Sequence, residues 1–372
     1  MLTLTAEGCA ARRQHLMENT PADCLIITNP RHIQYLTGVY ISQLGLTGYG
    51  SNYLAIDHTG KSTLIVHNFL GSNAEHAHVD EVVVWTWYDA QSNAGVPIHR
   101  SATERLASFL PDLSGTHVGI EEGQFPYGVV DKKTVDITDT LTTMRRTKDD
   151  DEIALIHEAI DAIAAGHRAA REHIAPGKSE LDLYTAVESA IVHAAGTAVL
   201  MLGDFASGER AWAGGGPATT RVMNAGDYMI FDLFPVVNGY KGDYTATLSV
   251  DGTLNDTHKR LQDALHAAVA TGEAALKPGN IAGDVYRATY QPVLNAGFSE
   301  ENIRHHAGHG LGLGHPEPPF FVPNSTEVLE VGDVVTLEPG AYGNDFGARI
   351  EHNYLITETG FERLTHHNTS FT

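Results

Sequence analysis

The fold of this chain is decided by a segment that reads Gly332-Asp333-Val334-Val335-Thr336-Leu337-Glu338, because an earlier segment has the same pattern. The earlier copy reads Gly226-Asp227-Tyr228-Met229-Ile230-Phe231-Asp232. Each copy has a Gly-Asp turn, four residues that favour a strand, and a closing acid. A Gly-containing turn and a second expected strand follow, and they carry Asp243 in one copy and Glu351 in the other. Two such hairpins in matching order predict two related halves in the C-terminal part of the chain.

Helical segments surround these hairpins. Four helices are expected, over residues 153–173, 181–195, 256–276 and 281–296. The first third of the chain alternates short apolar strands, such as Cys24–Thr28, with helices, which predicts an α/β domain with a mixed sheet. The charged stretch Arg145–Glu152 is expected to be a solvated helix start at a domain boundary. The predicted domains are residues 1–145 and 146–372.

Composition excludes several classes of protein. The chain has 372 residues, of which 42% are hydrophobic, so it can form a core and is not wholly disordered. Its formal charge of −22 and the lack of a Lys/Arg block argue against a nucleic-acid partner. No apolar run approaches the ~20 residues of a membrane span. With two cysteines, and with Arg12 and Arg13 interrupting any signal-peptide region, a cytoplasmic location is expected.

The acids of the two hairpins need a compensating charge. Burying an ionised carboxylate without a partner costs many kcal/mol. Arg349 and Lys241 are the only bases nearby in the sequence, and they can pair with one or two acids. A divalent metal ion compensates several carboxylates at once. The acids in question are Asp232, Asp243, Glu338 and Glu351.

A histidine-rich segment, residues 305–319, supplies a further ligand type. Its glycines do not form a dinucleotide loop, because prolines follow where that motif requires a helix. An extended glycine-rich strand, which lets the backbone pass close to a metal or substrate, is the better interpretation. His309 is the natural metal ligand, and His315 is a second candidate functional residue.

The predicted ligands are Asp232, Asp243, His309, Glu338 and Glu351. Four carboxylates and one imidazole suit Mn²⁺, Fe²⁺, Co²⁺ or Zn²⁺. Five ligands are too many for one catalytic ion and fit two ions that share a water or hydroxide. The chemistry expected of such a pair is hydrolysis, because it activates water and polarises a carbonyl.

These motifs resemble the superfamily of methionine aminopeptidases, prolidases, aminopeptidases P and creatinases. The match is strongest at Gly308–Gly312, Glu338–Tyr342 and Arg349–Glu351, and Ala22–Gly38 resembles the start of the prolidase/creatinase N-terminal domain. The resemblance implies an α/β (α+β) chain with a creatinase-like N-terminal domain and a C-terminal pita-bread domain with a pseudo-twofold repeat. It implies a homodimeric enzyme with two divalent ions, Mn²⁺ first among them, that cuts Xaa-Pro peptides.

The resemblance also implies roles for single residues. Glu338 is similar to the residue that takes a proton from the bridging water, besides holding metal. His315 resembles a histidine that contacts substrate, and His305 resembles a further active-site histidine. Arg349 resembles a residue that orients the ligand acids, and Thr245 shares a strand face with Asp243 in the same surroundings.

One departure from the family pattern concerns the substrate side of the site. Peptidases of this family usually carry a histidine upstream of the first metal aspartate, whereas Ala211–Pro217 has none. Gly214 and Gly215 in that stretch are expected to leave room for substrate. The departure keeps open a non-peptidase member of the fold that acts on a small C–N-containing or sulfonium metabolite. A non-catalytic binding module is a third hypothesis, which the complete ligand set disfavours.

Overall fold

The computed structural model describes residues 2–42, 44, 52–87, 89–91, 98–109, 117–121 and 133–372. The chain divides into two compact units, Met1–Arg145 and Arg146–Thr372. Among the described residues, no helix is long and apolar enough to cross a membrane.

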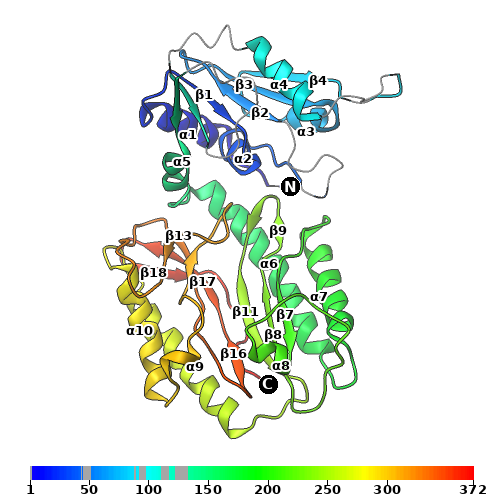
Figure 1. Ribbon diagram of the computed structural model, residues 1–372, viewed down its shortest axis with the longest axis vertical. Helices are drawn as coiled ribbons and strands as arrows, with labels where there is room; N and C mark the ends of the chain where they lie inside the picture. Colours follow the sequence, from blue (N-terminus) through cyan, green and yellow to red (C-terminus); the bar gives the residue numbers. More distant parts are fainter. Residues whose placement is uncertain are drawn as a thin grey trace. The chain divides into compact units, whose positions relative to one another are not determined.

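The N-terminal unit contains a mixed six-stranded sheet of order β4-β3-β2-β1-β5-β6 (Figure 1). Its strands are β1 (Cys24–Ile27), β2 (Tyr53–Ile56), β3 (Ser62–His67), β4 (Glu81–Trp85), β5 (His117–Ile120) and β6 (Lys133–Asp136). Its helices are α1 (Ala6–Glu18), α2 (Pro30–Thr37), α3 (Gly71–Ala74), α4 (Ile98–Phe109) and α5 (Thr138–Met144). β1 is fully buried and pairs antiparallel to β2 and parallel to β5, as expected for the centre of a mixed sheet.

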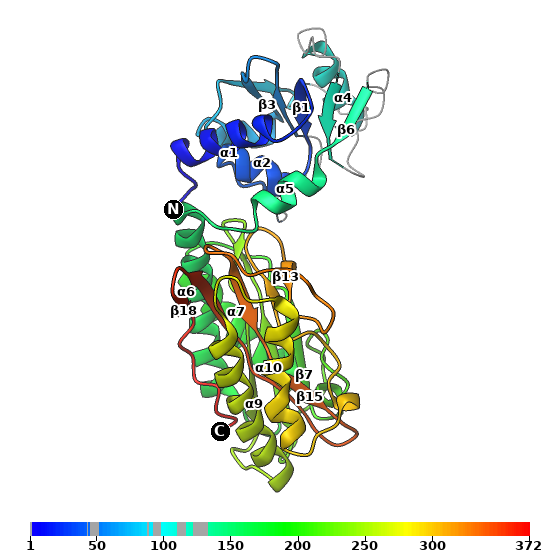
Figure 2. The ribbon, with the colours of Figure 1, turned by 90° about the vertical axis from the view of Figure 1, so that its left-hand side faces the viewer.

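Two pairs of long helices flank the strands of the C-terminal unit. They are α6 (Asp150–His173) with α7 (Glu180–Ala195), and α9 (Asp256–Ala275) with α10 (Ala282–Asn295). All four helices that the sequence predicts are therefore present. One pair lies on each side of the strands, as the two views in Figures 1 and 2 show. α6 begins with a capping box between Asp149 and Glu152, which satisfies free amide groups of its first turn.

The strands between the helix pairs form two main sheets. One has the order β11-β8-β7, and the other β13-β12-β14-β17-β18. Their bounds are β7 (Gly203–Ser207), β8 (Tyr228–Leu233), β11 (Tyr244–Ser249), β12 (His309–Gly310), β13 (Glu317–Phe320), β14 (Val334–Leu337), β17 (His352–Thr357) and β18 (Gly360–Arg363). Shorter elements are β9 (Val236–Val237), β10 (Tyr240–Lys241), β15 (Gly340–Tyr342), β16 (Gly347–Arg349) and α8 (Glu209–Trp212).

The repeated hairpins are present as antiparallel pairs, β8 with β11 and β14 with β17. The expectation that their later acids lie inside strands is wrong, because Asp243 immediately precedes β11 and Glu351 lies between β16 and β17. The reason is that the backbone N–H groups of both acids donate hydrogen bonds to the other hairpin instead of their own. The N–H of Asp243 donates to Asn353 Oδ1 at 3.0 Å, and that of Glu351 donates to the Thr245 carbonyl at 3.1 Å. The two hairpins are thereby joined at the acids.

Two further expectations need correction. The histidine-rich segment is not one extended strand, because the chain bends between β12 and β13 and folds back on itself. A Cβ on Gly310 would lie 2.0 Å from the Pro318 carbonyl oxygen, so glycine is required for this close approach. The charged stretch is not fully solvated either. Lys148 is buried because its ammonium pairs with the buried Glu317 carboxylate at 2.8 Å.

Candidate metal centre

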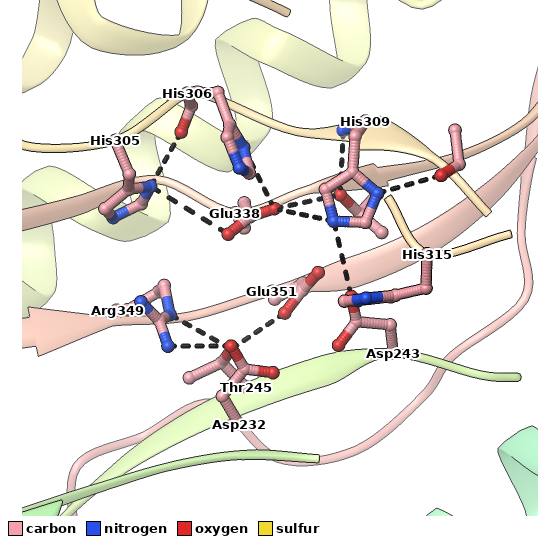
Figure 3. A network of polar contacts seen from close by, with 12 residues as sticks. Asp232, Asp243, Thr245, His305, His306, His309, His315, Glu338, Arg349 and Glu351 are labelled. Carbon is pink, nitrogen blue, oxygen red and sulfur yellow. Dashed lines mark hydrogen bonds and ion pairs between the residues drawn. The ribbon is translucent and has the colours of Figure 1, made fainter. Parts of the chain in front are cut away.

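The predicted ligands come together where two groups of strands meet. β7, β8 and β11 are called the first half below, and β12, β14 and β17 the second half. Figure 3 shows side chains from both halves pointing toward one another. Three overlapping groups, in each of which the ligand atoms lie within 4.8 Å of one another, contain all the predicted ligands. They are Asp232, Asp243 and Glu351; His309, Glu338 and Glu351; and Asp243, His309 and His315.

The register of the first half aligns three polar side chains in one row. Asp232 on β8 lies opposite Thr245 on β11 and, on its other side, opposite Asp204 on β7. Residues directly opposite on antiparallel strands face the same side of the sheet. Thr245 Oγ1 donates a hydrogen bond of 2.7 Å to Glu351 Oε2. This bond connects the row to a candidate ligand that lies next to the second half.

The carboxylates of the site are under-compensated by protein groups. Burial, and then the charge of Asp243, raise the pKa of Asp232 well above its ordinary value, and the pKa of Glu351 rises for the same two reasons. Asp232 Oδ1, Asp243 Oδ1 and Glu351 Oε1 are buried and have no hydrogen-bond partner among the described residues. Buried oxygen atoms of this kind are normally paired. The donor set therefore fits divalent cations, which would compensate the charge and occupy these oxygens.

His309 is held with one ring nitrogen toward the acids. Its Nδ1 lies 2.9 Å from the Gly310 carbonyl oxygen, which leaves Nε2 at 3.4 Å from Glu338 Oε1 and 3.5 Å from Asp243 Oδ2. Burial lowers the pKa of His309, but the hydrogen bond to Asp243 and the charge of Glu338 outweigh it and raise the pKa to about 9. A ring orientation fixed through the second nitrogen is typical of histidine ligands.

His315 lies against the same ligand acid. Its Nε2 is 2.6 Å from Asp243 Oδ2, and its ring stacks on Phe234 with centroids 3.9 Å apart. The structure thus brings His315 into the cluster, and its side chain remains 12% exposed. A polar group at the edge of the acids with a partly open face can also meet a substrate.

Arg349 connects several residues of the site. Its Nη2 donates to Asp232 at 2.7 Å and to Asp204 at 3.0 Å. Its Nε lies 3.3 Å from Thr245 Oγ1 and its Nη1 lies 3.1 Å from the Tyr342 hydroxyl. One buried guanidinium therefore fixes two acids, a hydroxyl and a phenol at once.

His305 lies behind Glu338. Its Nδ1 is 2.7 Å from the His306 carbonyl oxygen and 3.8 Å from Glu338 Oε2, and its Nε2 is 3.0 Å from the Tyr342 hydroxyl. Burial, followed by the charge of Arg349, lowers the pKa of His305 to about 4. A neutral imidazole in this place accepts or donates a single hydrogen bond on each nitrogen.

Sequence reasoning assigned no role to several residues of the site. His306 Nδ1 lies 3.3 Å from Glu338 Oε1, Phe234 stacks on His315, and Tyr342 bridges His305 and Arg349. Asp204 was missed because it lies in neither hairpin copy, and its place beside Asp232 follows only from the β7–β8 register. Of the two loop glycines expected to face substrate, a Cβ on Gly215 would collide with the Asp204 carboxylate, whereas a Cβ on Gly214 would meet no atom within 4 Å.

Two family models match the chain. The metallopeptidase family M24 model matches residues 154–358, and the creatinase/prolidase N-terminal domain model matches residues 10–146. These matches account for both units of the structure, including every residue of the predicted ligand set.

Individual relatives and solved structures are also peptidases by name. A Xaa-Pro dipeptidase of Pyrococcus furiosus is 30% identical over 253 residues, covering 66% of this chain and 72% of the relative. An uncharacterized peptidase of Bacillus subtilis is 29% identical over 275 residues, covering 72% and 77%. The solved structure of the prolidase from Pyrococcus furiosus superposes with a TM-score of 0.79 at 27% identity, covering 96% of this chain and 99% of that one.

Proposed function

The chain belongs to metallopeptidase family M24. Because of this membership, we propose that it is a dinuclear Xaa-Pro dipeptidase or Xaa-Pro aminopeptidase. The observation that carries the proposal is the buried cluster of four carboxylates and one imidazole, in which three carboxylate oxygens have no partner among the described residues. Relatives named Xaa-Pro dipeptidase support the choice of peptide.

Five side chains would hold the two ions: Asp232, Asp243, His309, Glu338 and Glu351. When bound, divalent ions at such a site lower the pKa of water and polarise a carbonyl. Glu338, which approaches His305, His306 and His309, would accept the proton of the attacking water. His315 would contact the substrate from its place beside Asp243. Arg349 and Thr245 would keep Asp232 and Glu351 in place.

We further infer Mn²⁺ as the resident metal, with Co²⁺, Zn²⁺ and Fe²⁺ as alternatives, because oxygen-rich sites with one imidazole suit these ions. Cys9 and Cys24 are buried thiols, which is consistent with the expected cytoplasmic location. The homodimer stays a prediction from the family resemblance, and light scattering of the purified protein would test it.

The proposed activity is tested with protein stripped by chelation and then reloaded with one metal at a time. Two Mn²⁺ ions per chain and renewed cleavage of Xaa-Pro dipeptides are expected. Matched Xaa-Ala dipeptides serve as the control for proline specificity. Full activity after stringent chelation, with no metal found by elemental analysis, would contradict the proposal.

A second candidate function is hydrolysis or lyase chemistry on a small C–N-containing or sulfonium metabolite. It is favoured by the loop at Gly214–Gly216, which offers no side chain, and by Asp204 next to it. Adding small C–N-containing and sulfonium compounds to the dipeptide assay separates the two candidates, because turnover of Xaa-Pro dipeptides alone would remove this one.

A further inference from the structure

One side of the metal centre is formed by Asp204 and Gly214–Gly216, called the β7 wall below. Asp204 lies directly opposite Asp232 in the β7–β8 pair, so both carboxylates face the same side of the sheet. The Asp204 side chain is 34% exposed, whereas that of Asp232 is 12% exposed. The β7 wall therefore presents an accessible acid next to a proposed metal ligand.

The absence of side chains in the glycine loop leaves space that the Asp204 side chain fills. Gly214, Gly215 and Gly216 have φ values of 111°, 137° and 125°, which residues with side chains rarely adopt. A Cβ on Gly215 would lie 2.4 Å from the Asp204 carboxylate. The carboxylate thus occupies the space into which a side chain from this loop would project.

The backbone N–H groups of the loop are already used. That of Gly214 donates to the Ala211 carbonyl at 3.2 Å, that of Gly215 to the Arg210 carbonyl at 3.3 Å, and that of Gly216 to Asp204 Oδ1 at 2.8 Å. These three described glycines therefore offer no free amide to an anionic group of a substrate. An anion-binding loop needs such amides directed at the ligand.

The guanidinium groups around the wall are also engaged. Arg349 uses four of its five N–H groups on Asp232, Asp204, Thr245 and Tyr342. Arg210 pairs with the buried Glu180 and donates to the Pro217 carbonyl. Arg304 donates to the Trp212 carbonyl. Each Asp204 oxygen, in contrast, has accepted one hydrogen bond and keeps a lone pair available.

We propose that Asp204 is a specificity-determining residue, which receives a cationic or hydrogen-bond-donating group of the substrate and disfavours a carboxylate. The inference rests on the proposed function of the neighbouring metal centre. A substrate carboxylate against the wall would meet a like charge and no free donor among the described residues of the wall, whereas an amide or ammonium group would pair with Asp204. The favoured class is accordingly Xaa-Pro amides, longer Xaa-Pro peptides, or a small cationic compound.

The experiment compares the metal-loaded wild type with Asp204→Asn, which keeps the shape and removes the charge. Prolinamide and proline serve as binding probes in thermal-shift titrations, and Xaa-Pro amide and Xaa-Pro acid serve as matched substrates. The wild type is expected to prefer the amide in binding and in kcat/KM. The variant is expected to reduce that preference by about tenfold, a typical effect of one partly exposed charge pair, while retaining its metal content.

Glu209→Gln is the matched control, because it removes one charge from an exposed acid on α8 that pairs with Arg221. The preference should stay unchanged in this variant. If Asp204 only holds Arg349 against Asp232, Asp204→Asn will lose metal and slow both substrates equally, which would overturn the proposal. Equal binding of both probes, or binding of neither, would also overturn it. Prolinamide preference without any peptide turnover would instead contradict the peptidase proposal alone.

Discussion

The first and second halves of the metal centre share a hairpin but differ in the third strand. In the first half, β7 places the Asp204 carboxylate beside the acid-bearing pair β8–β11. In the second half, β12 places the His309 imidazole beside β14–β17, where the backbone N–H of His309 donates to Thr336 Oγ1 at 3.1 Å. The shared hairpins supply the acids, and the third strands determine what lies next to them.

The two halves are also joined at the acids. The N–H of Asp243 donates to Asn353 of the second half, and the N–H of Glu351 donates to the Thr245 carbonyl of the first half. Neither half can therefore place its ligands without the other. The comparison teaches that the candidate metal ligands come from both halves, whereas Asp204 of the β7 wall comes from the first half alone.

The largest effect is expected from removing one ligand from either half, with Asp243→Ala in the first and Glu338→Ala in the second. Both variants should lose bound metal and activity by more than the ~10–100-fold that loss of an outer partner costs. Elemental analysis and kcat/KM measure the two losses, and circular dichroism verifies that each variant is folded. Wild-type metal content in one variant only would show that the halves do not share the ions equally.

A smaller effect is expected from Arg349→Lys, which keeps the charge between the halves. An ammonium cannot reproduce the planar fork that holds Asp232, Thr245 and Tyr342 together. Metal affinity or kcat/KM should fall by roughly 10–100-fold. Arg363→Lys, at the ion pair with Glu273, is the control for the same substitution elsewhere. Equal behaviour of the two variants would mean that the geometry of Arg349 is unimportant.

The clustering of the candidate ligands could be predicted because the hairpin occurs twice and because few bases are available to pair with its acids. Asp204 and Tyr342 could not be predicted in the same way, because their contacts join residues far apart in the sequence or depend on strand register. The burial of Lys148 was missed for a related reason, since its partner Glu317 lies in a distant segment. Periodicity identifies elements, but it does not specify which strand lies beside which.

A moderate effect on stability is expected from Gly215→Ala, which tests the β7 wall. Alanine at a φ of 137° is strained by about 1–3 kcal/mol, and its Cβ would also meet the Asp204 carboxylate. Gly214→Ala carries similar strain without that contact, because its Cβ would meet open space. Urea unfolding should therefore show a larger loss for Gly215→Ala. Equal losses would indicate that Asp204 moves aside at no cost.

The smallest effect concerns a pair of histidines behind β11, on the first half. His167 Nε2 lies 3.1 Å from the Tyr244 carbonyl oxygen, and His367 Nε2 lies 3.3 Å from that of Thr245. Burial is the main cause that lowers the pKa of His367 to about 3, and burial also lowers the pKa of His167 well below its ordinary value. The positive charges of Arg171 and Arg363 contribute to this lowering, so the imidazole of His367 is neutral in the folded chain near neutral pH.

The sign of the resulting pH dependence follows from these shifts. Between pH 6.5 and about 3 the unfolded chain binds a proton at His367 that the folded chain does not bind, so stability falls as the pH falls below 6.5. In metal-free protein, His367→Asn should make the unfolding free energy depend less steeply on pH. Between pH 4 and 6, its slope should be lower than that of the wild type by up to about 1.4 kcal/mol per pH unit. His193→Asn, at an exposed position near the end of α7, should leave the slope unchanged. An unchanged slope in His367→Asn would mean that the imidazole is already protonated in the folded chain. Its contact with the Thr245 carbonyl would then have to stabilise the added proton.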